Sequence, residues 1–440
     1  MLRTGAAVLA GRAARAATRL RGGGSALPGL VVERVDPGFL AHALEQVREG
    51  VVVVSGTNGK TTTTKMLVAI LRAHGKAVFT NPTGSNFTRG VISSMLGEVR
   101  LGGRLDADFA VVELDEAHAL RFTAAVTPTH SLVLNVARDQ LDRFAEIDHT
   151  AGLLATLAGQ TSRGVVLNAD DSFVARIRDG LPGGVTVRWF GVHSSAAHRL
   201  PELMEQDVRF EGAFTAPVTG PDDGLLRPLD DRSLAVLFGA GHALDDPATV
   251  GPLELQQRGF AAMINATAAA TTARLLLGPA FDPAAAAAAL RAVRPPFGRG
   301  EVVDVDGRPL ELVLVKNPAG FTVALGTYGT TPVATMIAIN DNYADGRDVS
   351  WLYDVSFESL RERGVGMASG VRAYDMALRL EYDDVPVAAV EPDLDRALDG
   401  FLAAHPGEPV RVFCTYTAMM ALRRTLAARH DLPDIGEEAS

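Results

Sequence analysis

Short apolar runs alternate with longer segments of helical periodicity through the first half of the chain. Residues 51–54 form such a run, which is followed by a Ser-Gly loop and then by helical periodicity over residues 61–71. Further apolar runs of strand length follow at residues 110–114, 131–135 and 165–168, and residues 147–158 have helical periodicity. Strands alternating with helices predict a parallel sheet with helices on both faces.

The pattern weakens between residues 193 and 234, where Gly, Pro and Asp are frequent. Short strands are predicted near residues 208–214. We interpret this region as an insertion or a small antiparallel subdomain. Two Ala-rich helices are then predicted over residues 259–277 and 283–293.

A sharp break follows at Arg294-Pro295-Pro296-Phe297-Gly298, where a domain boundary is expected. Beyond it, strands separated by helices are predicted at residues 310–315, 333–339, 365–369, 385–390 and 410–416. The pattern therefore predicts three parts: a helical segment (1–45), an α/β domain with an insertion near 193–234 (46–294) and a second α/β domain (295–440).

Composition narrows the classes of function. The length of 440 residues fits two or three domains, and the net charge of −10 argues against a general nucleic-acid binder. The single cysteine, Cys414, excludes a disulfide or a four-cysteine zinc site within one chain, and its strand-like setting favours a core residue. No run is expected to be long and apolar enough to cross a membrane. These features favour a cytoplasmic protein.

The N-terminal segment is basic. Arginines lie among alanines before the first acidic residue, Glu33; they are Arg3, Arg12, Arg15, Arg19 and Arg21. This pattern fits a transit-like peptide, an amphipathic helix on anionic lipid, or a surface helix that leads into the first domain. We favour the last interpretation and keep contact with the inner face of a membrane as a second hypothesis.

The strongest chemical signal follows the first predicted strand and opens a helix. It consists of Ser55, Gly56, Thr57, Asn58, Gly59, Lys60, Thr61 and Thr62. Glycines let backbone N–H groups approach phosphates, Lys60 reaches the terminal phosphates and the Thr61 hydroxyl ligates Mg²⁺. Val54 replaces the first Gly of the general P-loop pattern, so a generic NTPase is a poorer match. The alternative is a Gly-rich turn that caps a helix.

Polar residues follow two other strands. Glu113 ends the strand at 110–114 and is expected to hold Mg²⁺ in the crevice at the carboxyl end of the sheet, whereas Asp115 and Glu116 alone fit a solvated acidic cluster. Asn135 and the charged residues 138–144 either line the same crevice or form a salt-bridged loop. The segment 81–86 has only the features of a turn.

In the second domain, the polar segment 340–351 follows a predicted buried strand, which is a common location for a functional site. It also fits a turn before a helix that Asp348 or Ser350 caps. The two interpretations are compatible, because one residue can cap while another binds.

Several of these motifs together resemble a known family. Residues 56–62, Glu113, Asn135 with Asp139 and Asp142, and residues 168–171 resemble the Mur ligase central domain, whose plan folylpolyglutamate synthases share. Residues 316–321 and 345–354 are similar to the MurT family of synthetase subunits. The resemblance implies a Mur ligase-type central P-loop ATP-binding domain and a C-terminal Rossmann-like α/β domain.

The resemblance also implies an activity. MurT-type subunits act with a GatD-like glutaminase, whose Cys–His pair releases ammonia from glutamine, and they amidate the α-carboxylate of D-glutamate in the stem peptide of lipid II. An acyl phosphate formed with ATP and Mg²⁺ is the intermediate, and D-isoglutamine is the product. The chain is therefore expected to be the synthetase half of a heterodimer in peptidoglycan biosynthesis.

The family assigns roles to single positions. Asp348 matches an aspartate lent to the partner's Cys–His pair, and Lys60 serves phosphoryl transfer. Arg299, Asn265 and Asp341 match positions that approach ATP.

Three departures limit the match. The cysteines of a zinc ribbon are missing, so no zinc is expected; Gln140 replaces a His, which weakens the case for a second magnesium; and Ala262 replaces an Asn near adenine. The competing hypotheses are a Mur or folylpolyglutamate-type ligase that adds an amino acid and a nucleotide-binding scaffold that only activates a partner.

Overall fold

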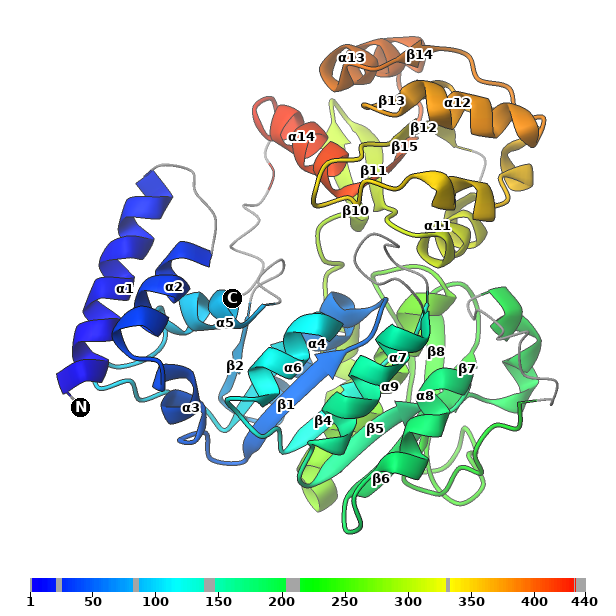
Figure 1. The fold of residues 1–440 in the computed structure, drawn as a ribbon. Helices are drawn as coiled ribbons and strands as arrows, with labels where there is room; N and C mark the ends of the chain where they lie inside the picture. Colours follow the sequence, from blue (N-terminus) through cyan, green and yellow to red (C-terminus); the bar gives the residue numbers. More distant parts are fainter. Residues whose placement is uncertain are drawn as a thin grey trace.

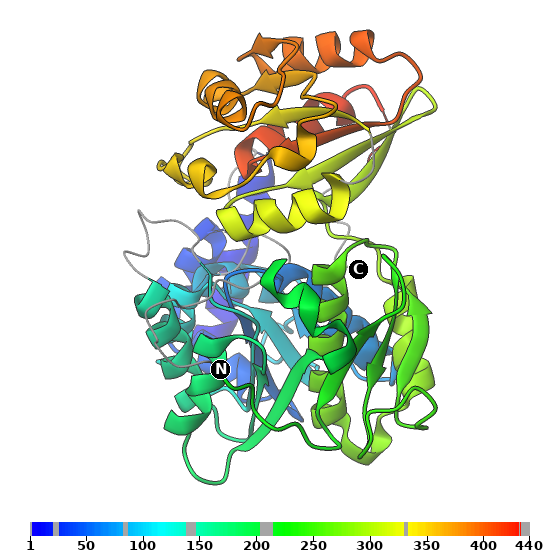
Figure 2. The ribbon, with the colours of Figure 1, turned by 90° about the vertical axis from the view of Figure 1, so that its right-hand side faces the viewer.

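Two α/β bodies lie one above the other in the computed structural model (Figures 1 and 2). The structure describes residues 2–20, 26–81, 87–137, 147–202, 214–329, 333–430 and 432. Of the segment 208–214, where short strands were predicted, residues 208–213 lie outside this part of the chain, and Phe214 is not in a strand.

The lower body contains a nine-stranded sheet in the order β2-β3-β1-β4-β5-β6-β7-β8-β9. Its strands are β1 (Gly50–Ser55), β2 (Val78–Thr80), β3 (Phe109–Glu113), β4 (His130–Val133), β5 (Gly164–Asn168), β6 (Thr186–Val192), β7 (Gly224–Pro228), β8 (Ser233–Leu237) and β9 (Val250–Glu254). Neighbouring strands from β2 to β7 are parallel, as predicted, whereas β8 and β9 are antiparallel to their neighbours.

Side chains of β1 alternate between two cores, because successive strand residues point to opposite faces. Val52 and Val54 belong to one core, and Val51 and Val53 belong to the other. The helices and turns of this body are α4 (Lys60–Ala73), α5 (Thr88–Met95), α6 (Glu116–Thr123), α7 (Ile147–Gly159), α8 (Ser172–Ala175), η1 (Arg176–Gly180), η2 (Ser194–Glu202), α9 (Phe260–Leu277), η3 (Gly278–Ala280) and α10 (Pro283–Ala292). Helices α4, α9 and α10 cover the first face, and α5 to α8 cover the second.

Helix α9 corrects one expectation. Together with η3 it is long and apolar enough to cross a membrane by length and composition, although no run was expected to reach that limit. Of its most apolar window, 67% is buried within the protein. Its packing against α4 and β6 accounts for the apolar composition.

The region interpreted as an insertion is part of the main sheet where the structure describes it. β7 pairs with β6, and β8 and β9 then extend the sheet in antiparallel fashion. Within residues 193–234, β7 and the start of β8 therefore belong to the main sheet and not to a separate subdomain, and their mutual pairing is antiparallel as expected. Period-2 patterns show that a strand exists, but they do not show which edge it joins.

The upper body has a six-stranded sheet in the order β10-β11-β15-β12-β13-β14. Its elements are β10 (Arg299–Val305), β11 (Arg308–Leu314), α11 (Pro318–Ala324), η4 (Leu325–Gly329), β12 (Ala334–Ala338), η5 (Ser350–Asp354), η6 (Glu358–Leu360), β13 (Met367–Ser369), α12 (Ala373–Tyr382), β14 (Val390–Glu391), α13 (Leu394–Ala404), β15 (Val410–Cys414) and α14 (Tyr416–Ala427). Cys414 is fully buried among core side chains, as predicted.

Two strand predictions in this body need correction. β10 was missed, although Asp306 and Gly307, both with positive φ, form the two-residue turn that joins it to β11. The strand predicted at 385–390 is reduced to a single bridge at Val387 and the short β14, because Pro386 has no N–H to donate to a ladder.

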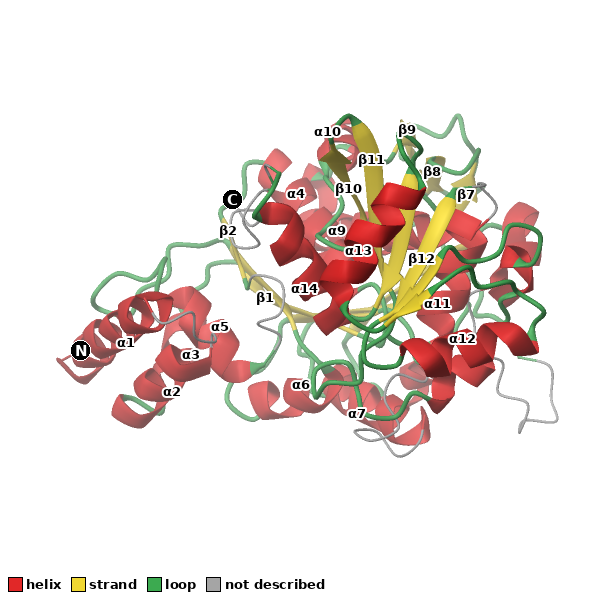
Figure 3. Cartoon of the chain, turned by 90° about the horizontal axis from the view of Figure 1, so that it is seen from above, coloured by secondary structure: helices red, strands yellow, loops and turns green. Residues whose placement is uncertain are grey.

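Helices α1 (Leu2–Leu20), α2 (Ala26–Val35) and α3 (Phe39–Leu44) lie at one side of the first sheet (Figure 3). Ala7 and Val8 of α1 are buried, and Arg12 donates to the carbonyl oxygens of Leu96 and Val99 at 3.0 and 2.6 Å. The basic segment is therefore a surface helix packed on the first body, as the favoured interpretation predicted.

Candidate active site

The loop between β1 and α4 has the backbone of an anion-binding turn. Gly59 adopts φ 86°, a left-handed conformation that disfavours other residues. A Cβ at Gly56 would lie 3.0 Å from the backbone nitrogen of Asn135, so this position is also confined to glycine. The N-terminus of α4 begins at Lys60 and directs free N–H groups into the loop.

Lys60 is held inside this loop. Its Nζ donates to the carbonyl oxygen of Gly56 at 2.5 Å and lies 3.5 Å from both carboxylate oxygens of Glu116. Glu116 is only 1% exposed, so the interpretation of a solvated acidic residue was wrong. A buried ion pair constrains Lys60 until a more strongly charged group competes for the ammonium.

Asp115, which precedes Glu116 in the chain, is also part of the site. It caps α6 by accepting from the N–H of Ala117. Burial opposes its ionisation, but the His118 imidazole, 3.6 Å from its carboxylate, and the charges of Lys60 and Lys316 together lower the pKa of Asp115 to about 2. Asp115 therefore remains a carboxylate at neutral pH.

Thr61 and Glu113 supply oxygen ligands suited to Mg²⁺. The Thr61 hydroxyl donates to Glu113 Oε1 at 2.9 Å, and burial raises the pKa of the Glu113 carboxyl despite the charge of Lys60. A divalent cation would stabilise this buried carboxylate, so the pair fits the expected metal. Within the described residues no three His, Cys, Asp or Glu side chains gather as a metal site, which leaves phosphate and water as the other ligands.

Asn81 fixes the position of Glu113. Its amide donates to the Glu113 carbonyl oxygen and accepts from the Glu113 N–H, both at 2.9 Å. Asn81 was expected only to be part of a turn, and the rest of segment 81–86 lies outside the described residues.

Asn135 clamps the phosphate loop. It follows β4, which ends two residues earlier than predicted, at Val133. Its Oδ1 accepts from the Asn58 N–H at 2.8 Å, its Nδ2 donates to the Asn58 carbonyl oxygen at 3.0 Å, and its own carbonyl oxygen accepts from the Thr57 N–H. Asn135 therefore positions the loop. Residues 138–146, with Asp139 and Asp142, lie outside the described chain.

Side chains of the 168–171 motif hold the backbone on both sides of Asn135 in place. Asn168 donates to the carbonyl oxygen of Leu134 at 2.9 Å, and Asp171 accepts from the N–H of Val136 at 2.8 Å. Both backbone neighbours of Asn135 are therefore tied to the end of β5. The motif acts on the phosphate loop through Asn135.

Replacing Asp170 with asparagine is expected to stabilise the protein at pH 7.5. Burial raises the pKa of Asp170 from an ordinary 3.8 to about 6, because the folded protein favours the protonated carboxyl. The contribution of Asp170 to the free energy of unfolding is therefore fully present below about pH 4 and lost as the pH rises through 6. A neutral amide avoids that loss, which amounts to roughly 2–3 kcal/mol. Thermal melts should show a higher melting midpoint for Asp170→Asn than for the wild type at pH 7.5, and equal midpoints for the two at pH 4.

The exposed Asp179→Asn is the matched control and should change neither midpoint. A gain for Asp170→Asn of equal size at both pH values would contradict the assignment of a buried, destabilised carboxylate.

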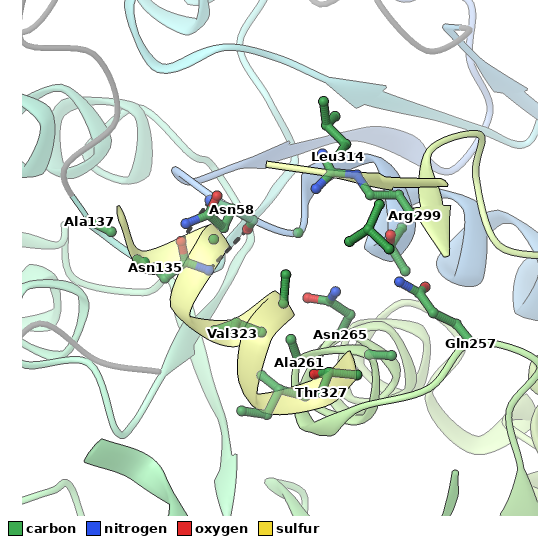
Figure 4. Close-up of a pocket in the computed structure, with 18 of the residues that line it drawn as sticks. Asn58, Asn135, Ala137, Gln257, Ala261, Asn265, Arg299, Leu314, Val323 and Thr327 are labelled. Atoms are coloured by element: carbon green, nitrogen blue, oxygen red, sulfur yellow. Dashed lines mark hydrogen bonds between the residues drawn. The ribbon is translucent and has the colours of Figure 1, made fainter. Parts of the chain in front are cut away.

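A pocket lies where the two bodies meet (Figure 4). The first body contributes the phosphate loop and the start of α9, and the second contributes β10, β11, α11 and η4. Its lining includes the predicted residues Asn58, Gly59, Thr62, Asn265 and Arg299. It also includes Gly320 of the 316–321 motif and residues that the sequence did not single out, among them Gln257, Arg258, Val323 and Tyr328.

Two residues before α11 link the second body to the phosphate loop. Asn317, which is fully buried, donates from Nδ2 to Asn58 Oδ1 at 3.2 Å and caps α11 through Gly320. Burial raises the pKa of Glu113, and the positive charge of Lys316 opposes that rise; the same charge contributes to the lowered pKa of Asp115. The site therefore requires both bodies.

The structure does not bring Asp341 or Asp348 into this pocket. Asp341 is ion-paired with Arg372 at 2.6 Å, although it was expected to approach the nucleotide. Asp348 is half-buried on the loop before η5, where it accepts from the N–H of Ser350 at 2.8 Å. It therefore makes the local cap expected of an Asx turn.

Comparison with protein families divides the chain in the same way as its two sheets. Residues 54–217 match the Mur ligase middle domain, and residues 314–419 match the MurT ligase C-terminal domain. A lipid II isoglutaminyl synthase (glutamine-hydrolyzing) subunit MurT of Streptococcus pneumoniae is 29% identical, with 97% of this chain and 98% of that one covered. The chain combines a Mur ligase middle domain with a C-terminal domain of the MurT type, and it resembles MurT subunits over nearly its whole length. The corresponding MurT subunit of Staphylococcus aureus is also 29% identical, over 90% of this chain and 92% of its own length.

Solved structures agree with this MurT assignment at the level of fold. The MurF ligase of Thermotoga maritima in complex with ADP has a TM-score of 0.62 at 17% identity, covering 91% of this chain and 85% of that one. The α/β Mur ligase fold expected from the sequence is therefore confirmed. The domain matches and the full-length similarity to MurT subunits, taken together, make the chain an ATP-dependent ligase of the Mur type.

Proposed function

We propose that this chain amidates the α-carboxylate of D-glutamate in the stem peptide of lipid II, with ATP as the phosphoryl donor and ammonia from a glutaminase subunit. The observation that carries the proposal is a complete phosphate and cation site next to a second body of the MurT type. Full-length similarity to subunits named lipid II isoglutaminyl synthase supports the choice of substrate.

The chemistry follows from the weakness of a carboxylate as an electrophile. A carboxylate oxygen attacks the γ-phosphorus of ATP, ADP leaves, and an acyl phosphate forms. Ammonia then attacks the carbonyl carbon, the C–O bond to phosphate breaks, and one proton is released as the amide and inorganic phosphate form. Lys60 stabilises the charge that develops on the transferred phosphoryl group, and the N-terminus of α4 adds its free N–H groups.

Thr61 and Glu113 would hold Mg²⁺, which neutralises phosphate charge when it is bound. Asn81 keeps the Glu113 backbone in place, and Asn135 keeps the loop in the shape that receives phosphates. Asn317 closes the second body over this site through Asn58.

An exposed apolar stripe on the second body supports the proposal of a partner subunit. Tyr374, Leu378 and Tyr382 lie one turn apart on α12, and Tyr382 is 69% exposed. Tyr353 packs edge-on against Tyr382 at 5.9 Å between ring centroids. Exposed aromatic groups of this kind are typical of protein–protein interfaces.

The stripe is fastened to the loop that carries Asp348. Arg379 of α12 donates to the carbonyl oxygens of Leu352 and Val355 at 3.0 and 2.6 Å, and Arg372 pairs with Asp341 before Asp348. Helix α12 therefore holds both ends of the loop. A glutaminase seated on the stripe would lie beside Asp348, as the proposal requires.

Replacing Leu378 with aspartate is expected to prevent binding of the glutaminase subunit, because it places a charge in the centre of the stripe. Size-exclusion chromatography with the purified partner should show loss of the complex, and glutamine-dependent amidation should fall at least about tenfold while ammonia-dependent amidation persists.

Leu101→Asp, which changes an equally exposed leucine on the first body, is the control and should leave the complex intact. If the Leu378→Asp variant still formed the complex, the stripe would not be part of the interface.

Mass spectrometry of lipid II tests the function itself. The full chain is incubated with lipid II, Mg²⁺, ATP and ¹⁵N-ammonium, and then with glutamine and a glutaminase partner. ATP-dependent incorporation of one ¹⁵N into the D-glutamate residue is the expected result. No incorporation under either condition would overturn the proposal and favour a ligase that adds an amino acid.

The proposed substrate is membrane-borne, so we further propose that the chain acts in the cytoplasm at the inner face of the membrane. Co-sedimentation with lipid II-containing vesicles should exceed that with vesicles lacking lipid II. Equal sedimentation with both would contradict recruitment by substrate.

A further inference from the structure

The pocket between the two bodies has a phosphate end and a second, apolar end. Asn265 lies where the phosphate end meets the apolar end. Its side chain packs against the phosphate loop so closely that a Cβ at Gly59 would lie 2.4 Å from its Oδ1. Gly259, the cap of α9, is six residues earlier, roughly 9 Å along the helix at 1.5 Å per residue. A ribose and its base can span that separation.

The walls of the second end are suited to a flat ring. Ala261 and Ala262 of α9 form one side, and Val323 and Ala324 of α11 form the other. Thr327 closes the end against Gly259, where an added Cβ would lie 2.5 Å from the threonine methyl carbon. Apolar walls with few polar groups are typical of sites for aromatic ligands.

Gln257 lines this end and carries an unsatisfied polar atom. Its Oε1 is buried and has no hydrogen-bond partner among the described residues. Such an atom costs stability unless a ligand pairs with it. The neighbouring Gln256 is different, because it is exposed and donates to the carbonyl oxygen of Arg291 at 3.2 Å.

We propose that Gln257 reads the 6-position of a purine base and makes this chain selective for adenine over 6-oxopurine nucleotides. A carboxamide offers an acceptor beside a donor, and the N6 and N7 edge of adenine offers a donor beside an acceptor. A 6-oxopurine presents two acceptors on that edge, so one of them faces the amide oxygen. The inference rests on the proposed use of ATP and deepens it.

The assignment also accounts for Ala262. With alanine at 262, the α9 side of the base end has no amide beyond Asn265, which lies next to the phosphate loop. Gln257 supplies a carboxamide from the loop before the helix instead.

Calorimetric titration of the full-length chain with ADP and with IDP, both with Mg²⁺, tests the inference without lipid II or a partner. The wild-type chain should bind ADP at least about tenfold more tightly than IDP. Gln257→Leu should weaken ADP binding by a similar factor and bring the ADP-to-IDP ratio close to one. Gln257→Glu keeps an acceptor and should retain the preference, while Gln256→Leu should behave as wild type.

An unchanged ratio in Gln257→Leu, with ADP still bound, would overturn this inference and leave the proposed ligase intact. Failure of the wild-type chain to bind either nucleotide would overturn both. Thermal melts of each variant separate a loss of binding from a loss of fold.

Discussion

Replacing Lys60 with alanine is expected to lower amidation by at least about a hundredfold, with ammonia and with glutamine alike. The Lys60 ammonium is buried in the phosphate loop, which the Asn135 clamp holds in place. The proposed Mg²⁺ ligands Thr61 and Glu113 are unchanged in this variant, so ATP binding should weaken less than the rate falls. Calorimetric titration with ATP measures the binding, and ¹⁵N incorporation into lipid II measures the rate.

Loss of fold is a separate risk, because Lys60→Ala leaves the buried Glu116 without its cation. The double variant Lys60→Ala with Glu116→Gln removes that charge and should recover thermal stability without recovering activity. Lys76→Ala, which breaks a partly exposed ion pair with Glu49, is the control and should keep full activity. Retained amidation in Lys60→Ala would refute the role of the phosphate loop.

Strand and loop chemistry in the first body could be predicted because the signals are local. Four buried residues in a row, a glycine with positive φ and a lysine at a helix start are all visible in residues 51–60. Glu113 was found in the same way, from its position at the end of a buried strand. Each depends on neighbours in the sequence, so no knowledge of the tertiary fold is required.

Glu116 and Asn81 could not be predicted, because their roles depend on partners far along the chain. Glu116 lies 56 residues from Lys60, and Asn81 lies 32 residues from Glu113. An acidic residue in a polar run has the pattern of a solvated one until a distant lysine is placed beside it. The pocket residues Gln257 and Tyr328 were missed for the same reason, since the wall they complete spans two bodies.

The edge strands show a different limit. β8 and β9 were not recognised as parts of the main sheet, because hydrophobic alternation does not specify the neighbouring strand. The hairpin of β10 and β11 could have been found, since Asp306-Gly307 directly after the valine-rich segment 302–305 is a strong turn signal. The buried helix α9 shows that apolar length alone does not separate a core helix from a membrane span.

Replacing Asp348 with asparagine is expected to lower glutamine-dependent amidation by about a hundredfold or more while ammonia-dependent amidation stays near the wild-type rate. Asp348 does not line the nucleotide pocket, so the ligase site should not sense the change. A carboxylate hydrogen-bonded to a histidine fixes its tautomer and stabilises its charged form, and an amide does neither. The backbone cap at Ser350 can be kept by asparagine, so the loop should retain its shape.

Three measurements distinguish this role from the alternatives. The complex should still form with Asp348→Asn, whereas Leu378→Asp should abolish it, so chromatography separates a missing carboxylate from a missing interface. Asp354→Asn, which changes an exposed carboxylate six residues further on, should leave both activities unchanged. A parallel fall of the ammonia-dependent and glutamine-dependent rates in Asp348→Asn would assign the residue to the ligase body, because a group that acts only on the partner's histidine cannot slow a reaction supplied with free ammonia.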